Sequence, residues 1–502
     1  MGTASKNKVL FCLESLLISM FFSFLIYIQT SKYGIGLSPD SITYLKLANA
    51  ISQEGFVFII NNPSATFPPF YPLLLSVVSV LFNIDILIIA RWFNIVLAFL
   101  FSFLSLVLYR KLTKNLLILP ALGLIVAFSK PTNLVFCYAW SEPLFIFIIL
   151  LITFSIETTT CKRSILCGLL TSLAILTRYA GVAIIPAMCL YIFIQKSEFA
   201  EKIKKCFCYA TLPVLIYIVY IARNYCFTKT FMGERPASAT GLISNCDRAI
   251  STVVFWWNNS YNFMFFSVFF VLGAFTWNYR KELTQYFFTS PNIVKFSACY
   301  FLIYFLFITL SSTVTAYDLI DDRLMSPIFL STTIFILYVI TYIVSKKEIF
   351  SGTVLVVLVV CFALSFAKTT VKEIIMRMDE GAGQYASAFW QENELLNYLK
   401  KDKKIFLKNI YTNDIAPFFL IDRSLRPKMI PSKKNNNSAQ FIGANLENLV
   451  IKYPDLKNSY LVYFNVDDRK EVFQLKELQA ICEMDIIVET VSGTLFKLGE
   501  CK

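Results

Sequence analysis

Long apolar runs constrain the fold of this chain more than any other feature of its sequence. They recur from the amino terminus to about residue 370, and several approach the ~20 residues that a helix needs to cross a bilayer. Hydrophobic residues make up 57% of the chain and charged residues 16%, against the ~45–50% and ~25% usual in soluble domains. The pattern excludes a single soluble globule and predicts a polytopic α-helical membrane protein.

We expect about eleven transmembrane helices. The first covers residues 9–28 and follows Lys6 and Lys8. A signal peptide is the alternative, but this run is too long for a typical signal core and no small-residue cleavage site follows it. The other expected spans are 86–108, 116–128, 134–156, 164–176, 182–194, 206–221, 262–277, 293–310, 324–344 and 352–367.

The distribution of basic residues indicates the orientation. The chain has 46 Lys and Arg against 33 Asp and Glu, a net charge of +13, and the residues from Val371 onward are nearly balanced. With a cytoplasmic amino terminus, every expected inner loop is net basic, as the positive-inside rule requires. Nucleic acid is not an expected partner, because its binding needs a clustered basic face on a soluble module.

An odd number of spans places the two termini on opposite sides of the membrane. We therefore expect a transmembrane domain over residues 1–369, with a first extracytoplasmic loop at about 30–69, and a soluble domain over residues 370–502. Apolar runs at 461–464 and 486–488 and a helical pattern at 392–399 predict a small α/β fold for the second domain. It would lie on the periplasmic or extracellular side of a bacterial plasma membrane.

Several kinds of chemistry are excluded by missing residues. The chain has no histidine, which rules out Ser-His and Cys-His catalysis and removes the commonest metal ligand. Its 13 cysteines form no CxxC pair, and Cys226 and Cys246 in one outer loop are either a disulfide or a free pair. Neither of the glycine-rich nucleotide-binding patterns, GxxxxGK[ST] and GxGxxG, is present.

Ionisable residues gather at the expected outer surface of the membrane. Asp40 stands at a helix start, with Tyr44 one turn later, and is either an N-cap or a general base. Glu142 lies inside an expected span, where a charge is costly and usually marks a site or a buried pair. These charges either line one cavity, or the arginines snorkel to headgroups while the carboxylates sit in water. The other candidates are Lys46, Arg178, Arg223, Arg235, Asp322 and Arg323.

Six motifs in this order resemble the GT-C glycosyltransferases over about residues 8–345. They are nearest to the bacterial relatives of the dolichyl-phosphate-mannose protein mannosyltransferases and to the aminoarabinose transferases, families 39 and 83. The motifs are Ser38-Pro-Asp-Ser-Ile-Thr-Tyr44, Pro68-Pro-Phe-Tyr-Pro72, Ser141-Glu-Pro-Leu-Phe145, Leu176-Thr-Arg-Tyr-Ala-Gly181, Arg223-Asn224 with Gly233-Glu-Arg235, and Asp322-Arg-Leu-Met-Ser-Pro327.

The resemblance implies transfer of a sugar, with inversion, from a polyprenyl-phosphate donor to a lipid, glycan or protein acceptor on the extracytoplasmic face. Asp40 matches the catalytic carboxylate that activates the acceptor, and Arg178 and Arg323 match arginines expected to bind the donor phosphate. Further donor-site candidates are Arg223, Arg235, Tyr44 and Lys46. Glu142 and Asp322 are candidates for a second acid or a cation ligand. The resemblance implies no definite cofactor and leaves open whether a divalent cation is needed.

Two departures from the family pattern argue against a true protein mannosyltransferase. Asp40 is followed by Ser41 and not by a second acid, and the family's histidine-bearing motif is missing. The main alternative function is a membrane transporter or lipid-linked sugar flippase with a periplasmic accessory domain. A transporter favours ionisable groups near the bilayer midplane and internal repeats, and this sequence shows no repeat.

Overall fold

The computed structural model forms two compact units. The first comprises Met1–Ile35 and Leu47–Asp379, and the second comprises Gly36–Lys46 and Glu380–Lys502. The residues that the structure describes are 3–55, 58, 65–112, 118–157, 160–257, 280–316, 318–345, 363, 364, 367, 368, 370–430, 454–456, 459–466 and 473–501.

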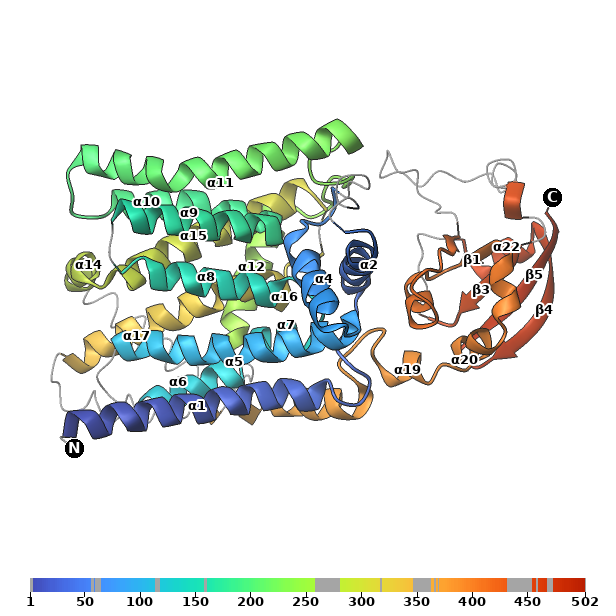
Figure 1. The fold of residues 1–502 in the computed structure, drawn as a ribbon, viewed down its shortest axis with the longest axis horizontal. Coiled ribbons are helices and arrows are strands. Elements are labelled where there is room, and N and C mark those ends of the chain that lie inside the picture. Colours follow the sequence, from blue (N-terminus) through green and yellow to red (C-terminus); the bar gives the residue numbers. More distant parts are fainter. Residues whose placement is uncertain are drawn as a thin grey trace. The chain divides into compact units, whose positions relative to one another are not determined.

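The first unit is a bundle of long helices that lie side by side with roughly parallel axes (Figure 1). Among the described residues, four are long and apolar enough to cross a membrane: α1 (Thr3–Gln29), α5 (Ile86–Leu112), α11 (Phe199–Thr228) and α15 (Asn292–Val314). A bent pair, α6 (Ile118–Ala127) and α7 (Lys130–Cys137), meets at 48° and gives a fifth candidate when the pair is counted as one span. The protein is therefore a multi-pass membrane protein.

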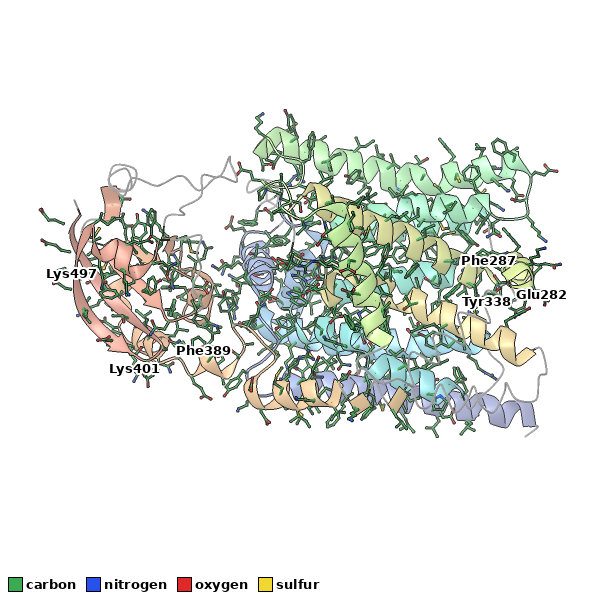
Figure 2. All side chains as sticks on the ribbon, turned by 180° about the vertical axis from the view of Figure 1, so that it is seen from behind. Glu282, Phe287, Tyr338, Phe389, Lys401 and Lys497 are labelled. Carbon is green, nitrogen blue, oxygen red and sulfur yellow. The ribbon has the colours of Figure 1, made fainter. Side chains whose placement is uncertain are left out.

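The remaining helices of this unit are shorter. The elements are α4 (Phe70–Phe82), α8 (Glu142–Ser155), α9 (Cys161–Thr177), α10 (Ile184–Phe193), α12 (Leu242–Trp257), α14 (Arg280–Thr289), α16 (Asp322–Met325) and α17 (Phe329–Ser345). Figure 2 shows Glu282 of α14 and Tyr338 of α17 close together, and Glu282 accepts a 3.0 Å hydrogen bond from Tyr342. The expected span 262–277 and most of 352–367 lie outside the described residues, so the count of eleven stays a prediction.

The expected span 134–156 is not one continuous helix. α7 ends at Cys137 and α8 begins at Glu142, with Pro143 in its first turn, where proline fits without losing a hydrogen bond. The side-chain amide of Asn94 donates to the carbonyls of Phe136, at 3.0 Å, and Tyr138, at 2.7 Å. The bond to Phe136 satisfies a carbonyl that the break would leave bare in an apolar setting, whereas the Tyr138 carbonyl also accepts the Trp140 amide at 2.7 Å. Glu142 consequently stands at a helix start, where the helix dipole favours an anion.

The second unit contains a five-stranded mixed sheet in the order β2-β1-β3-β5-β4. β1 pairs in parallel with β2 and β3, whereas β5 pairs antiparallel with β3 and β4. The expected strands at 461–464 and 486–488 fall in β3 and β4, and the expected helix at 392–399 overlaps α20. The elements are α19 (Ala388–Gln391), α20 (Glu394–Lys401), β1 (Ile410–Thr412), β2 (Lys428–Met429), β3 (Tyr460–Phe464), α22 (Leu475–Gln479), β4 (Cys482–Thr490) and β5 (Gly493–Cys501).

This unit has its own hydrophobic core, which explains why a segment without transmembrane runs folds compactly. Leu395, Leu396 and Leu399 are buried on one face of α20, as expected of an amphipathic helix. The side chains that form the core cluster are Tyr411, Ile430, Leu456, Leu461, Phe473, Leu478, Phe496 and Leu498.

A short piece of the first loop, Gly36–Lys46, belongs with the second unit. Leu37 forms a parallel β-bridge with Gln384, and its carbonyl accepts a 3.0 Å hydrogen bond from the amide of Tyr385. Contacts thus divide the chain differently from the expected limits at 369 and 370. The expected domains, 1–369 and 370–502, are defined by function and not by contacts, and they stay predictions.

The cysteines settle one alternative and add a new observation. Cys226 and Cys246 are both free, so the disulfide between them is not formed. Cys482, at the start of β4, is disulfide-bonded, and its register partner on β5 is Cys501.

Candidate functional site

A buried ion cluster joins three segments of the first unit that lie far apart in sequence. The Oε1 atom of Glu142 is 2.6 Å from Nη1 of Arg178 and 2.5 Å from Nε of Arg323. The Glu142 side chain is fully buried, whereas those of Arg178 and Arg323 are 15% and 10% exposed. The structure therefore brings together three of the predicted site residues.

Local sequence places each member of this cluster. Arg178 is the extended residue that ends α9, and Gly181 in the following 3-10 turn packs so closely that a Cβ there would lie 2.6 Å from a backbone nitrogen. Asp321 caps the short helix α16, which carries Arg323, by accepting the Leu324 amide at 3.1 Å. Trp140 lies against Arg323, whose Cζ is 4.2 Å from the ring centroid, and this cation–π contact holds the guanidinium in place.

The two carboxylates that pair with these arginines are buried to very different extents. One buried carboxylate faces two guanidinium groups, and the second carboxylate near Arg323, that of Asp318, is 3.4 Å away and 74% exposed. The Oε2 atom of Glu142 has no hydrogen-bond partner among the described residues. Two guanidinium groups aligned by one carboxylate can bind an anion such as a phosphate through paired hydrogen bonds.

A second cluster adjoins the first through the peptide that links Arg178 to Tyr179. The Asn224 amide donates to the hydroxyl of Tyr179 at 3.0 Å and accepts from Nη1 of Arg223 at 3.1 Å. Nε of Arg235 donates to the backbone carbonyl of Met232 at 3.3 Å, and its guanidinium group lies near Tyr179. Sequence reasoning identifies the two arginines of this cluster but misses Tyr179 and Asn224, although both stand in the GT-C-like motifs.

Asp322 contacts two side chains, Trp256 and Lys130, that are not among the candidates identified from the sequence. One carboxylate oxygen accepts from Nε1 of Trp256 at 2.8 Å, and the other lies 3.0 Å from Nζ of Lys130. Among the described residues, no group of three aspartate, glutamate or cysteine side chains is placed to hold a metal ion.

The structure places Asp40, Tyr44 and Lys46 in the second unit, on α2 (Pro39–Glu54). The hydroxyl of Ser38 accepts the Ser41 amide at 3.2 Å, so Ser38 caps this helix and Asp40 stands half-buried in its first turn. The N-cap alternative for Asp40 is therefore wrong. Tyr44 is buried. Burial, together with the nearby charge of Arg426, lowers the pKa of Lys46 below its usual value.

Comparison with solved structures identifies the fold. The aminoarabinose transferase ArnT of Cupriavidus metallidurans superposes in its apo state with a TM-score of 0.61 at 10% identity, covering 99% of this chain and 98% of that one. The same enzyme bound to undecaprenyl phosphate gives 0.59 at 10% identity and 98% of each chain. The Archaeoglobus fulgidus oligosaccharyltransferase tethered to an acceptor peptide gives 0.51 at 12% identity, covering 90% of this chain and 69% of that one.

No protein-family model and no curated protein sequence matches the chain. The structural likeness is therefore evidence of fold. The GT-C resemblance expected from the motifs is confirmed at the level of the fold, over nearly the whole length of ArnT.

Proposed function

We propose that this protein is an integral membrane glycosyltransferase that moves a sugar from a polyprenyl-phosphate donor to a lipid, glycan or protein acceptor. The observation that carries the proposal is the buried cluster in which the single carboxylate of Glu142 holds the guanidinium groups of both Arg178 and Arg323. In this reaction the leaving group is the polyprenyl phosphate, which gains negative charge as its bond to the sugar breaks. Prepositioned guanidinium groups stabilise charge of this kind in the transition state.

The fold supports the same class of donor. ArnT, which shares the fold over nearly its full length, has been observed bound to undecaprenyl phosphate. The archaeal oligosaccharyltransferase with the lower similarity has been observed tethered to an acceptor peptide. A carrier-linked donor and a separate acceptor are the two substrates that our proposal requires.

The proposed chemistry is a single inverting displacement. The acceptor oxygen or nitrogen attacks the anomeric carbon, the bond from that carbon to the phosphate oxygen breaks, and Asp40 takes the proton released by the acceptor. Arg178 and Arg323 bind the departing phosphate. Glu142 and Asp322 hold cationic side chains, Glu142 the two arginines and Asp322 Lys130, and we assign them this role in place of metal binding.

We also propose that the second unit lies outside the cytoplasm, with the amino terminus inside. The basic inner loops support this orientation. The disulfide at Cys482 supports it independently, because disulfides persist in oxidising compartments such as the periplasm and are rare in the cytosol.

The test is release of the carrier. We would reconstitute the protein with a panel of undecaprenyl-phosphate sugars and a host membrane extract, and measure free undecaprenyl phosphate. Asp40→Asn keeps the shape of the side chain and should abolish release. The matched control is Asp85→Asn, because Asp85 caps α5 through the Leu87 amide at 2.8 Å and asparagine caps equally well. Movement of intact donor across the membrane without release would instead establish the transporter.

A further inference from the structure

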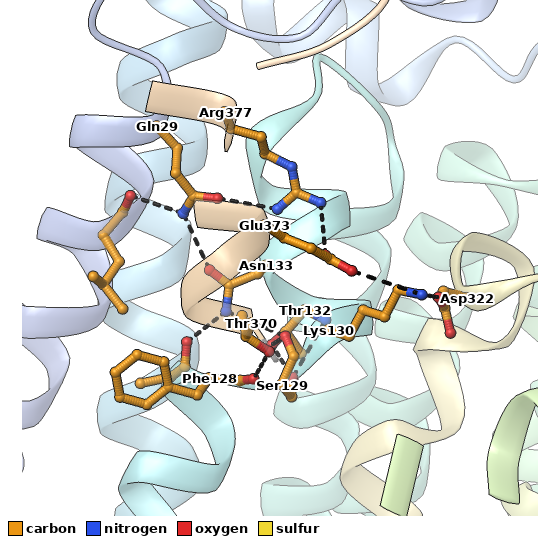
Figure 3. Close-up of polar contacts among 12 residues, drawn as sticks. Gln29, Phe128, Ser129, Lys130, Thr132, Asn133, Asp322, Thr370, Glu373 and Arg377 are labelled. Atoms are coloured by element: carbon orange, nitrogen blue, oxygen red, sulfur yellow. Dashed lines mark hydrogen bonds and ion pairs between the residues drawn. The ribbon is translucent and has the colours of Figure 1, made fainter. Parts of the chain in front are cut away.

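Lys130 lies between two carboxylates from distant parts of the first unit. Its Nζ atom is 3.0 Å from Oδ2 of Asp322 and 3.8 Å from Oε1 of Glu373 (Figure 3). Asp322 opens α16 and directly precedes Arg323, whereas Glu373 belongs to the helical residues 370–380 near the end of this unit. Lys130 itself begins α7, so it links three elements.

Glu373, one of the two carboxylates beside Lys130, is itself held by other side chains. Glu373 pairs at 3.2 Å with Arg377, one turn along the same helix, and the Arg377 side chain is 8% exposed. Arg377 also donates to the side-chain carbonyl of Gln29 in α1 at 3.0 Å, and the Gln29 amide donates to Asn133 of α7 at 3.2 Å (Figure 3). The helix over 370–380 is thereby tied to α1 and α7, which gives Lys130 a fixed support.

Asp322, the other carboxylate beside Lys130, belongs to the same short helix as Arg323 of the candidate site. α16 is a single turn of four residues that continues directly into a 3-10 turn (Ser326–Ile328) and α17, so the chain holds its carboxyl-terminal end. At its amino-terminal end the side chains that hold it are Asp321, which caps it, and Asp322, which bonds to Lys130 and Trp256. A shift of α16 would move Arg323 away from Glu142.

We propose that Lys130 is a positioning residue, which holds Asp322 between α16 and the helix over 370–380 and so keeps Arg323 aligned with Glu142 and Arg178 for the donor phosphate. The proposal rests on the proposed function. Lys130 acts on the phosphate through Arg323 and not by direct contact. This role adds a group to the site that lies outside all six GT-C-like motifs.

The test measures the affinity of the purified full-length protein for undecaprenyl phosphate in detergent micelles. Lys130→Gln should weaken binding about tenfold, the range of effect seen when a residue acts through a coupled contact. Lys130→Arg keeps the charge and both ion pairs, and should restore most of the affinity. Lys111→Gln is the matched control: it breaks an ion pair whose lysine is 38% exposed, close to the 39% of Lys130, and should leave binding unchanged.

Asp322→Asn distinguishes a Lys130 that positions Arg323 from a Lys130 that contacts the phosphate directly. If Lys130 only positions Arg323, this variant weakens binding as Lys130→Gln does, and the double variant is no weaker than either single variant. If Lys130 touched the phosphate, removing Asp322 would free it, and affinity would hold or rise, which would overturn the proposal. Equal binding by Lys130→Gln and the native protein, with binding lost in Arg323→Gln, would also overturn it while leaving the proposed function intact. Failure of the native protein to bind would reject both.

Discussion

Glu142→Gln should destabilise the protein far more than the loss of an exposed carboxylate, because Glu142 compensates two buried guanidinium groups. The side chains of Arg178 and Arg323 are 15% and 10% exposed, so little water can replace the lost carboxylate. Removing one partner of a buried ion pair costs about 3–5 kcal/mol. Glu157→Gln is the control, since its pair with Lys111 is 38% and 41% exposed and such pairs contribute about 0–1 kcal/mol.

The same variant should respond more strongly to ligand. Undecaprenyl phosphate would restore negative charge beside the two arginines, so it should raise the unfolding temperature of Glu142→Gln by more than that of the native protein. Thermal unfolding in detergent, with and without undecaprenyl phosphate, measures both effects. A variant as stable as the native protein would refute the reasoning about the buried cluster, and a smaller response to the ligand would refute the assignment of the cluster to phosphate.

Three further predictions concern packing, titration and the disulfide. Gly181→Ala should lower the unfolding temperature, since its Cβ would meet a backbone nitrogen at 2.6 Å, whereas Gly241→Ala, with open space around it, should not. Arg426→Gln should raise the pKa of Lys46, measured by the pH dependence of lysine acylation. In the native protein this lowered pKa makes the free energy of unfolding rise with pH between the folded-state pKa and about 10.5. In that range Lys46 binds more protons in the unfolded chain than in the folded one. Cys482→Ser should destabilise the second unit by about 2–4 kcal/mol, seen as faster limited proteolysis.

The transmembrane helices can be predicted where apolarity is continuous and local. α1, α5, α11 and α15 coincide with expected runs, since each can satisfy its own backbone hydrogen bonds. The break between α7 and α8 cannot be predicted, because the Phe136 carbonyl that it exposes is satisfied by Asn94, 42 residues earlier in the chain. Hydropathy along a sequence contains no information about such a partner.

The candidate site can be predicted in its residues and not in their pairing. The sequence places Glu142 and Arg323 at one surface, yet they are 181 residues apart and nothing local identifies each as the other's partner. Lys130 escapes prediction because a lysine between two apolar runs has the same sequence signature as an ordinary interface lysine. The placement of Asp40 in the second unit depends on long-range backbone pairing at Leu37, which no local pattern reports.

The most direct test of the phosphate assignment is an experimental structure of the protein with undecaprenyl phosphate bound in lipid nanodiscs. We predict that phosphate oxygens lie within hydrogen-bond distance of the guanidinium groups of Arg178 and Arg323, with Glu142 still between them. A phosphate bound elsewhere, with this cluster unchanged and without ligand, would contradict the assignment.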